Sequence, residues 1–197
     1  QMEFSRGKIT RDMEIVGETD RSGTTVTFKP DPEMFEELEY DYDVLHTRMR
    51  EQAFLNAGLR IRTVDLRPGR EQSDEMCYEG GIREFVAYLN TDKDVLHQNI
   101  IYMAGTRDTS MAEVALQYND GYSETILSFA NNVHTPEGGM HEEGFKKALT
   151  RVLNKYGQKM GILKNDEKVS GDDCREGLTC IISVKLTEAQ FEGQTKA

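Results

Sequence analysis

The last seven residues of the chain bring together side chains that suit a phosphate group. They read Phe191-Glu192-Gly193-Gln194-Thr195-Lys196-Ala197, so a flexible glycine, an amide, a hydroxyl and an ammonium group occupy consecutive positions. A lysine is a point-charge partner for phosphate, and an amide can orient a water molecule or a phosphate oxygen. A polar, frayed chain end has the same composition and is the commoner case. Composition alone therefore leaves both interpretations open.

Two other charged groups could carry chemistry, and each has a simpler structural interpretation. Asp172 and Asp173 form an acidic pair, but Ser170-Gly171-Asp172-Asp173 is typical of a capping box at the start of a short helix, which accounts for both carboxylates. A basic stripe at helical spacing could face DNA or could be a solvated helix face, which is the commoner situation. The stripe consists of Lys146, Lys147, Arg151 and Lys155.

Patterns for metal binding and nucleophilic catalysis do not occur in the sequence. The histidines have neither zinc-finger nor zincin spacing, and the cysteines do not cluster. The sequence also has no P-loop, no GxGxxG motif and no nucleophile elbow. We therefore expect no metal site in the chain, and spacing alone defines no complete active site. The histidines are His46, His97, His134 and His141, and the cysteines are Cys77, Cys174 and Cys180.

The composition is that of an acidic globular protein. The 197 residues carry a formal net charge of −11 and are 37% hydrophobic, enough for one large or two small domains. Nucleic acid could bind only through a local basic patch. An odd cysteine count without a signal peptide favours the cytoplasm, and no apolar run approaches the roughly 20 residues of a membrane span. Because the chain begins Gln1-Met2-Glu3, we expect a piece of a longer protein.

Hydrophobic periodicity predicts the elements that must position these residues. The N-terminal part indicates a β-ribbon from residues 2–4 and 9–16 and a short helix over residues 32–35. Between them, β-branched and aromatic residues predict a strong strand over residues 24–28, which Pro30 ends. The first part of the chain should therefore contribute to a sheet.

The middle of the chain predicts a helix over residues 43–56 and then a hairpin that pairs residues 59–66 with residues 76–78. Glu79-Gly80-Gly81 breaks the pattern, and a clear amphipathic helix begins at Ile82. We place a domain boundary at this break. The predicted domains comprise residues 1–79 and 80–197.

The last part of the chain predicts four strands and one long helix. Asn119-Asp120-Gly121 is a strong hairpin signal that should join the second strand to the third. The long helix has acidic residues in its first turn and basic residues later, which matches the helix macrodipole. The strands cover residues 99–104, 112–118, 125–131 and 178–186, the helix covers residues 140–159, and its apolar stripe consists of Phe145, Leu149, Val152, Tyr156 and Met160.

Several long motifs resemble a known protein family. They are Glu113-Val114-Ala115-Leu116-Gln117-Tyr118-Asn119-Asp120-Gly121-Tyr122, Phe129-Ala130-Asn131-Asn132 and Thr135-Pro136-Glu137-Gly138-Gly139-Met140-His141. Shorter matches are Tyr78-Glu79-Gly80-Gly81-Ile82, Arg175-Glu176-Gly177-Leu178-Thr179 and Phe191-Glu192-Gly193-Gln194-Thr195-Lys196. Together they resemble the transducer region of bacterial type IIA topoisomerases, the family of DNA gyrase B and its topoisomerase IV counterpart.

The resemblance extends over essentially the whole chain and implies an α+β or α/β sandwich fold. Residues 1–79 resemble the C-terminal part of a GHKL-type ATPase domain with part of its sheet. Residues 80–197 resemble a transducer domain without its C-terminal helix. The family fold contains a left-handed βαβ crossover, whereas the general handedness rule predicts a right-handed one.

The resemblance also implies roles for particular residues. Gly23 and Thr24 correspond to residues at the adenine pocket of the family, and Val26 lines the same pocket. Gln194 and Lys196 correspond to the pair that reaches from the transducer into the ATPase domain and contacts the ATP γ-phosphate. The implied cofactors of the intact enzyme are ATP and Mg²⁺, with none expected on this chain.

The family uses basic residues on the long transducer helix to line a cavity that holds the transported DNA, and Lys146 is the matching position. The chain departs from the family pattern at Met140, where threonine is usual. It also lacks the family's general-base glutamate, magnesium-binding asparagine, adenine-binding aspartate and glycine-rich lid. The isolated chain is therefore predicted to be inactive.

The function implied by the resemblance is that of a fragment of the ATP-hydrolysing subunit of DNA gyrase, which couples ATP binding and hydrolysis to DNA strand passage and negative supercoiling. The segment 78–90 looks more like gyrase than topoisomerase IV. The implied partners are the gyrase A protein, a second copy of the gyrase B protein in an A2B2 heterotetramer, and DNA. The alternatives are a fragment of the corresponding topoisomerase IV protein acting in decatenation, a mismatch-repair relative, and a non-enzymatic α/β interaction module.

Overall fold

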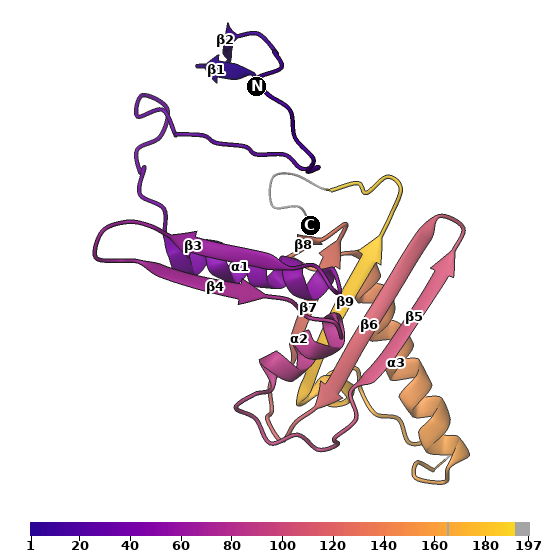
Figure 1. The fold of residues 1–197 in the computed structure, drawn as a ribbon. Coiled ribbons are helices and arrows are strands. Elements are labelled where there is room, and N and C mark those ends of the chain that lie inside the picture. Colours follow the sequence, from indigo (N-terminus) through magenta and orange to yellow (C-terminus); the bar gives the residue numbers. More distant parts are fainter. Residues whose placement is uncertain (165, 192–197) are drawn as a thin grey trace. The chain divides into compact units, whose positions relative to one another are not determined.

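The computed structural model of the protein describes residues 1–164 and 166–191 (Figure 1). By its internal contacts the chain divides into two compact units, Gln1–Tyr42 and Asp43–Ala197. The predicted domain boundary between residues 79 and 80 lies inside the second unit and stays a prediction. No helix of the described residues is long and apolar enough to cross a membrane.

The first unit contains one β-hairpin. Strands β1 (Glu3–Ser5) and β2 (Lys8–Arg11) pair antiparallel across a turn in which Arg6 and Gly7 have φ values of 50° and 75°. The predicted ribbon is confirmed in position, but its second strand ends at Arg11 instead of residue 16. Arg6 also pairs with Asp31 at 2.9 Å, so an ion pair connects the hairpin to the rest of this unit.

The predicted strand over residues 24–28 is wrong, because this segment has no regular secondary structure. The side chains of Val26 and Phe28 are 79% and 73% exposed. A strand is stabilised by hydrogen bonds to neighbouring strands, and no described strand lies beside this segment. The predicted helix over residues 32–35 is only a turn, with the Phe35 amide donating to the Asp31 carbonyl at 3.1 Å.

The second unit is built on a mixed five-stranded sheet in the order β5-β6-β9-β7-β8. All neighbouring strands are antiparallel except β7 and β9, which are parallel. The strands are β5 (Ile101–Arg107), β6 (Ser110–Tyr118), β7 (Thr125–Ala130), β8 (Val133–His134) and β9 (Leu178–Lys185).

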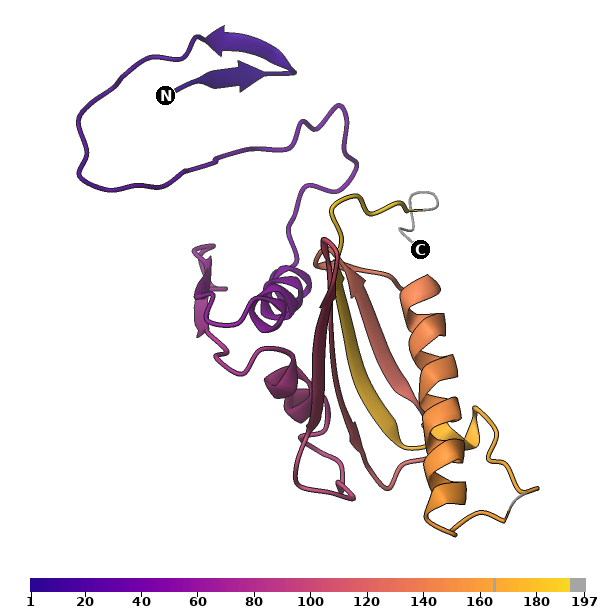
Figure 2. The same cartoon turned by 90° about the vertical axis from the view of Figure 1, so that its right-hand side faces the viewer.

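The connection from β7 to β9 is the left-handed crossover that the family resemblance implies. It passes through the long helix α3 (Met140–Lys159), whose bounds match the predicted residues 140–159. When β9 points upward, as in Figure 1, β9 lies to the right of β7 and α3 lies behind the sheet, as the turned view in Figure 2 confirms. A right-handed connection would place the helix on the opposite face.

The predicted hairpin at Asn119-Asp120-Gly121 is wrong, because β9 lies between β6 and β7. These three residues instead pack against the turn before β9, where the Asn119 amide donates to the Gly177 carbonyl at 2.9 Å. Gly177 has a φ of 68°, and a Cβ there would lie 2.3 Å from the Asn119 carbonyl oxygen, so this position requires glycine. The next hairpin after β6 along the chain joins β7 to β8. It turns at Asn131 and Asn132, which both have positive φ.

Helices cover both faces of the sheet, so the unit is an α/β sandwich (Figure 2). Helices α1 (Tyr42–Leu55) and α2 (Ile82–Leu89) lie on one face, and α3 lies on the other. The hairpin of β3 (Ile61–Asp65) and β4 (Gln72–Met76) connects α1 to α2. A hairpin is confirmed here, but the predicted partner strand over residues 76–78 is wrong except at Met76, because the turn is shorter and the pairing begins at Gln72. The fold class expected from the resemblance is therefore confirmed.

Two hydrophobic cores occupy the two faces of the sheet. Between the sheet and helices α1 and α2, Phe54 and Phe85 pack against Phe129 and Ile181. Between the sheet and α3, buried Leu178, Cys180 and Ile182 of β9 pack with Phe145 and Leu149 of the helix. Residues of β9 alternate between the cores, which explains why a nearly continuous run of β9 is buried.

Only the first half of the predicted apolar stripe of α3 is packed against the sheet. Val152, Tyr156 and Met160 are 45%, 56% and 70% exposed. Figure 1 shows the reason, since the C-terminal end of α3 extends past the strands, where no sheet covers it. The helical period predicts a face, but it does not predict how far the facing layer extends.

The first testable prediction concerns the core around Phe54, a residue that is 1% exposed and stacked on Tyr78 and Phe85 at centroid distances of 3.7 and 4.6 Å. Phe54→Ala should lower the free energy of unfolding by about 3–5 kcal/mol, because it leaves a cavity between rings. Urea unfolding followed by circular dichroism measures this. Val44→Ala on the same helix, where the side chain is 66% exposed, is the control and should change stability by less than about 0.5 kcal/mol. Equal losses in both variants would contradict the assigned core.

Candidate functional site

The residues predicted to contact ATP are not gathered into one site by the described structure. Gln194 and Lys196 lie outside the described residues. Gly23 and Thr24 are exposed in the irregular segment of the first unit. Val26 lines a hollow of about 1220 Å³ in that unit, together with apolar side chains that include Phe4 and Phe28.

That hollow does not have the character of a finished nucleotide pocket. Val26 and Phe28 lie on its wall, yet their side chains remain largely exposed to solvent. An adenine pocket is usually enclosed and apolar, with a few placed polar groups. Across residues 1–164 and 166–191, no group of three or more His, Cys, Asp or Glu side chains could hold a metal ion, so the described residues alone do not fit Mg²⁺.

A basic groove along α3 is the candidate site that the described residues do form. It has a volume of about 700 Å³ and lies between the helix and the segment that returns from α3 to β9. Its charged lining contains six cations and one anion, in a chain whose net charge is −11. The basic groove is lined by Glu143, Lys146, Lys147, Thr150, Arg151, Asn154, Lys155, Gln158, Lys168, Gly171 and Arg175.

Two local hydrogen-bond patterns hold the return segment against α3. The Asn154 side chain donates to the Val169 carbonyl at 3.0 Å and accepts from the Val169 amide at 2.9 Å, as a neighbouring strand would. Ser170 and Asp173 form the predicted capping box, in which each side chain accepts from the other residue's amide. The short helix η1 (Asp173–Arg175) follows, and together these bonds place Lys168 and Arg175 beside α3.

Half of the cations in the groove are already neutralised by carboxylates. Lys146 pairs with Glu142 at 2.8 Å and with Glu124 at 3.4 Å, and its side chain is only 21% exposed. Arg175 also binds Glu124, at 2.5 Å. Lys147 forms a longer pair with Glu143 at 3.5 Å. These pairs fix the wall of the groove and leave little free charge on it.

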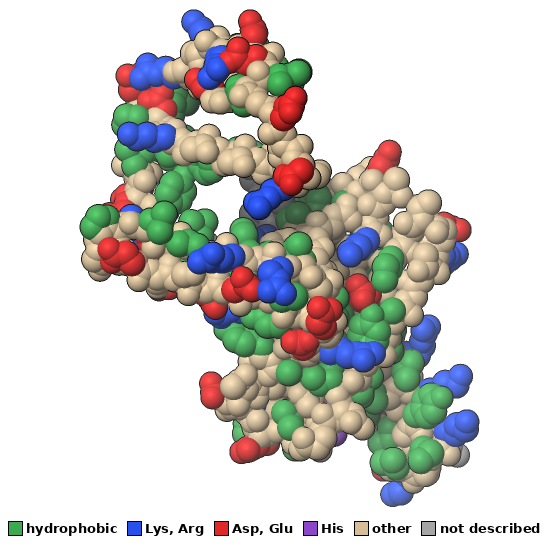
Figure 3. Space-filling model, viewed as in Figure 1, with side chains coloured by type: hydrophobic (Ala, Val, Ile, Leu, Met, Phe, Trp, Pro, Cys, Tyr) green, Lys and Arg blue, Asp and Glu red, His purple; other side chains and the backbone are tan. Residues whose placement is uncertain are grey.

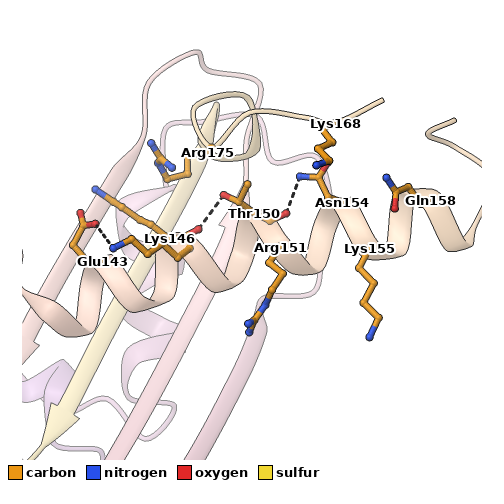
Figure 4. A pocket seen from close by; sticks show the side chains of 11 residues that line it. Glu143, Lys146, Thr150, Arg151, Asn154, Lys155, Gln158, Lys168 and Arg175 are labelled. Carbon is orange, nitrogen blue, oxygen red and sulfur yellow. Dashed lines mark hydrogen bonds and ion pairs between the residues drawn. The ribbon is translucent and has the colours of Figure 1, made fainter. Parts of the chain in front are cut away.

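The other three cations, Arg151, Lys155 and Lys168, form no ion pair within the described part of the chain. Arg151 and Lys155 are one helical turn apart and extend from the same side of α3, while Lys168 stands on the return segment (Figure 4). Lys and Arg side chains gather over the far end of α3 on the molecular surface (Figure 3). Free positive charge is therefore concentrated along this helix.

Hydrogen bonds and ion pairing keep Glu142 and Lys146, on the wall of the groove, in their charged forms. Burial alone would raise the pKa of Glu142, but hydrogen bonds from Lys146 and Ser128 and the Lys146 charge outweigh it and hold that pKa below its usual value. The hydrogen bond to Glu142 raises the pKa of Lys146. Burial lowers the pKa of the neighbouring His141. At neutral pH the Glu142–Lys146 pair is therefore ionised, and it anchors α3 to Ser128 of β7.

Sequence reasoning found part of this groove. The predicted stripe of Lys146, Lys147 and the two cations after them does line it. Lys146, the single position chosen from the family resemblance, lines it as well, but its charge is neutralised. Lys168 and Arg175 were not predicted, because they belong to a different segment that the helical period does not reach. The Ser170–Asp173 capping box, which lies between Lys168 and Arg175 in the sequence, was the available signal that a short helix begins in this segment.

The fold and the groove together define an α/β sandwich with a left-handed crossover and a basic helix face. The family description DNA gyrase B matches residues 81–197. The chain is similar to the DNA gyrase B protein of Clostridium acetobutylicum, with 55% identity over 98% of this chain and 30% of that protein. It is 53% identical to the DNA gyrase B protein of Enterococcus faecalis, with the same coverage.

Solved structures agree with this similarity. The 43K ATPase domain of Thermus thermophilus gyrase B matches 98% of this chain, which covers 53% of that structure, with a TM-score of 0.80 and 38% identity. The topoisomerase IV ATP-binding domain of Francisella tularensis, at 23% identity and a TM-score of 0.75, shares the fold. The chain belongs to the DNA gyrase B family. It spans about 30% of the length of the curated relatives it matches.

The second prediction concerns the Glu142 carboxylate. Its pKa in the folded state lies below the reference value of 4.5, so its contribution to stability is complete above that pH and is lost as the pH falls through the lowered value. Glu142→Gln should therefore show a smaller loss of unfolding free energy than the parent between about pH 6 and about pH 3. Urea unfolding at both pH values tests this.

The matched control for this prediction is Glu143→Gln, since the Glu143 side chain is 56% exposed and its ion pair is long. Exposed ion pairs contribute little, so this variant should lose stability on acidification almost as the parent does. An identical acid response in the parent and in Glu142→Gln would contradict the assigned role of Glu142.

Proposed function

We propose that the chain is part of the ATP-hydrolysing subunit of a DNA gyrase, which couples ATP binding and hydrolysis to DNA strand passage and negative supercoiling. The observation that carries the proposal is the basic groove on α3, with three cations free of ion pairs among the described residues, in an acidic member of the DNA gyrase B family. The groove supplies the local basic patch that DNA binding requires in a chain of this charge.

The chemistry of the groove suits a DNA segment of any sequence. Arg151, Lys155 and Lys168 are long, flexible cations that reach phosphate oxygens, and neutralising phosphates releases counterions whatever the bases. A strand-passage enzyme must transport segments of arbitrary sequence, so contacts to phosphates serve it better than contacts to bases. Lys146 stays a proposed DNA residue, with a lower expected contribution because Glu142 and Glu124 share its charge.

The nucleotide part of the proposal concerns the complete gyrase B protein. Gln194 and Lys196 are proposed to contact the γ-phosphate, and Gly23, Thr24 and Val26 are proposed to lie at the adenine pocket. ATP and Mg²⁺ are the proposed cofactors, and the isolated chain is proposed to be inactive because the family resemblance assigns the general base and the magnesium ligand to residues outside it. A domain 1–79 from the ATPase region and a domain 80–197 from the transducer are part of this proposal.

The proposed partners are the gyrase A protein, a second copy of the gyrase B protein in an A2B2 heterotetramer, and DNA, in the cytoplasm. A topoisomerase IV function has less support. The similarity to gyrase B proteins reaches 53–55% identity, whereas the topoisomerase IV structure shares 23% and supports the fold alone. Supercoiling rather than decatenation is therefore the activity to test first.

The third prediction tests the groove. Replacing both Arg151 and Lys155 by alanine in the complete protein should weaken DNA binding similarly for unrelated sequences, and should reduce the slope of log affinity against log salt by about 1 for each lost phosphate contact. Fluorescence anisotropy with labelled duplexes over a salt series measures this. Lys164→Ala is the control, because its exposed side chain pairs with Glu167 outside the groove. An unchanged salt slope in the double variant would contradict a DNA contact at the groove.

The fourth prediction tests the nucleotide contact. Lys196→Ala in the complete enzyme should lower ATP turnover and supercoiling but leave ATP-independent DNA relaxation largely intact. A charge-assisted hydrogen bond contributes on the order of 1.5–3 kcal/mol, so the expected loss is about tenfold or more. Turnover and gel-based topology assays on one preparation measure it, with relaxation as the internal control. Normal ATP-driven supercoiling in the variant would refute the assigned role.

A further inference from the structure

One carboxylate outside the basic groove neutralises two of the cations that line it. Glu124, in the segment between β6 and β7, pairs with Arg175 at 2.5 Å and with Lys146 at 3.4 Å. Arg175 and Lys146 come from two different elements, the return segment and α3 (Figure 4). Among the described residues that line the groove, Glu124 is absent. The free charge of the groove is therefore set partly by a residue that does not belong to its wall.

The parallel pairing of β7 with β9 brings Glu124 and Arg175 together. Thr125, the first residue of β7, pairs with Thr179 of β9. Glu124 comes directly before Thr125, and Arg175 lies in η1, four residues before Thr179 (179 − 175). Both side chains therefore lie at the end of the sheet where these two strands begin. The ion pair follows from the register of the sheet and does not depend on a chance meeting of flexible surface side chains.

Arg175 depends on Glu124 for its neutralisation more than Lys146 does. Lys146 has a closer partner in Glu142, at 2.8 Å. The other partner of Arg175 is Asp172 at 2.6 Å, whose side chain is 94% exposed. Water and dissolved salt screen so exposed a carboxylate strongly. Glu124 is therefore the main counter-charge of Arg175 and only a secondary one of Lys146.

The Arg175 guanidinium also keeps one donor group free beside the groove. Its Nε donates to Glu124 and its Nη2 donates to Asp172, whereas Nη1 forms no hydrogen bond with any described residue. A Cβ added to Gly171 would lie 2.9 Å from Nη1, and both Gly171 and Thr150 line the groove beside it. A guanidinium presents its donors in a rigid fork that fits phosphate oxygens. Arg175 thus has the geometry for a phosphate contact, while Glu124 shares its charge.

We propose that Glu124 limits the affinity of the groove for DNA by masking Arg175, which would otherwise bind a further phosphate. The inference rests on the proposed DNA-binding function of the groove. Each phosphate contact strengthens binding and makes it more dependent on salt. A transported segment must be released as well as held, so a groove with every cation available would hold it too tightly. Glu124 keeps one cation in reserve and leaves the contact reversible.

The fifth prediction removes the charge of Glu124 but keeps its shape. In the complete protein, Glu124→Gln should bind unrelated duplexes about threefold to tenfold more tightly at about 50 mM salt, and the slope of log affinity against log salt should steepen by about 1. Fluorescence anisotropy over a salt series measures both quantities. Loss of an ion pair with a purely structural role would weaken binding or leave it unchanged, so a gain in affinity is the diagnostic result.

Three further variants separate masking from a general loss of negative charge. Glu143→Gln removes a carboxylate that lines the groove, but its ion pair is long and exposed, so affinity should rise by less than about twofold. Glu75→Gln breaks another 2.5 Å ion pair, in the β3–β4 hairpin, and should leave DNA affinity unchanged. In an Arg175→Gln background, Glu124→Gln should change affinity by less than about twofold, since residues that act through one another are not additive.

A second substitution keeps the test decisive if Glu124→Gln disturbs the fold, which circular dichroism and thermal unfolding detect. Glu124→Asp retains the carboxylate but shortens the side chain by one methylene, which draws the charge away from Arg175. This variant should bind DNA more tightly than the parent, by a smaller factor than Glu124→Gln. A folded Glu124→Asp protein with the affinity and salt slope of the parent would overturn the inference.

The outcomes distinguish the masking role from the proposed function. If replacing Arg151 and Lys155 weakens binding but Glu124→Gln does not strengthen it, the masking role is wrong and the groove stands as a DNA site. The same conclusion follows if Glu143→Gln gains as much affinity, or if the full gain persists without Arg175. If replacing Arg151 and Lys155 leaves the salt slope unchanged, the groove is not a DNA site and the masking role fails with it.

Discussion

The sheet of the second unit depends on the insertion of its last strand, β9, between β6 and β7. Strand β9 pairs with β6 from Met111 to Tyr118 on one side and with β7 from Thr125 to Ala130 on the other. Before β9 is in place, the β5–β6 and β7–β8 hairpins have no strand in common, so the sheet cannot close. Both cores depend on this strand as well, because its alternate residues face α3 and the α1–α2 layer. Pairing strands so far apart in sequence costs loop-closure entropy, which the two buried faces must offset.

A buried network of neutral polar groups fixes the register of this strand. The Thr179 hydroxyl donates to Asn90 at 2.7 Å and accepts from Asn119 at 3.2 Å, and the Asn90 side chain donates to Gln117 at 3.0 Å. All four side chains are at most 5% exposed, so each would be costly without its partners. A shift of β9 by one residue would turn Thr179 toward α3 and break its hydrogen bonds to Asn90 and Asn119. The hydrophobic faces stabilise the strand, and this network selects one alignment.

The local parts of this architecture could be predicted from the sequence, and the non-local parts could not. Glycines at both ends and a 3.6-residue period gave α3 its bounds, and the Ser170–Asp173 capping box was recognised because all its signals lie within four residues. The position of β9 between β6 and β7 has no local signal, and Asn119-Asp120-Gly121 therefore suggested the wrong neighbour. The irregular segment around Val26 shows the same limit, since β propensity forms a strand only beside a partner. In the groove, the helical period identified the stripe, but only the structure shows that Lys146 is neutralised while Arg151 has no ion pair with any described residue.

The basic groove on α3 and the β7–β8 turn depend on different physical interactions. In the groove, Arg151, Lys155 and Lys168 have no ion pair among the described residues, and the attraction of such cations for an anion acts at a distance and depends on salt. At the Asn131–Asn132 turn, the two side chains donate to the Leu186 carbonyl and to the Asn56 side-chain oxygen. Such hydrogen bonds between neutral amides act only at contact and depend strongly on angle. If that turn were fixed by lysine and glutamate, its geometry would respond to the field of a DNA duplex lying along α3 and to ionic strength. Because its side-chain bonds join neutral amides, the Asn131–Asn132 turn should keep its geometry over a range of ionic strength.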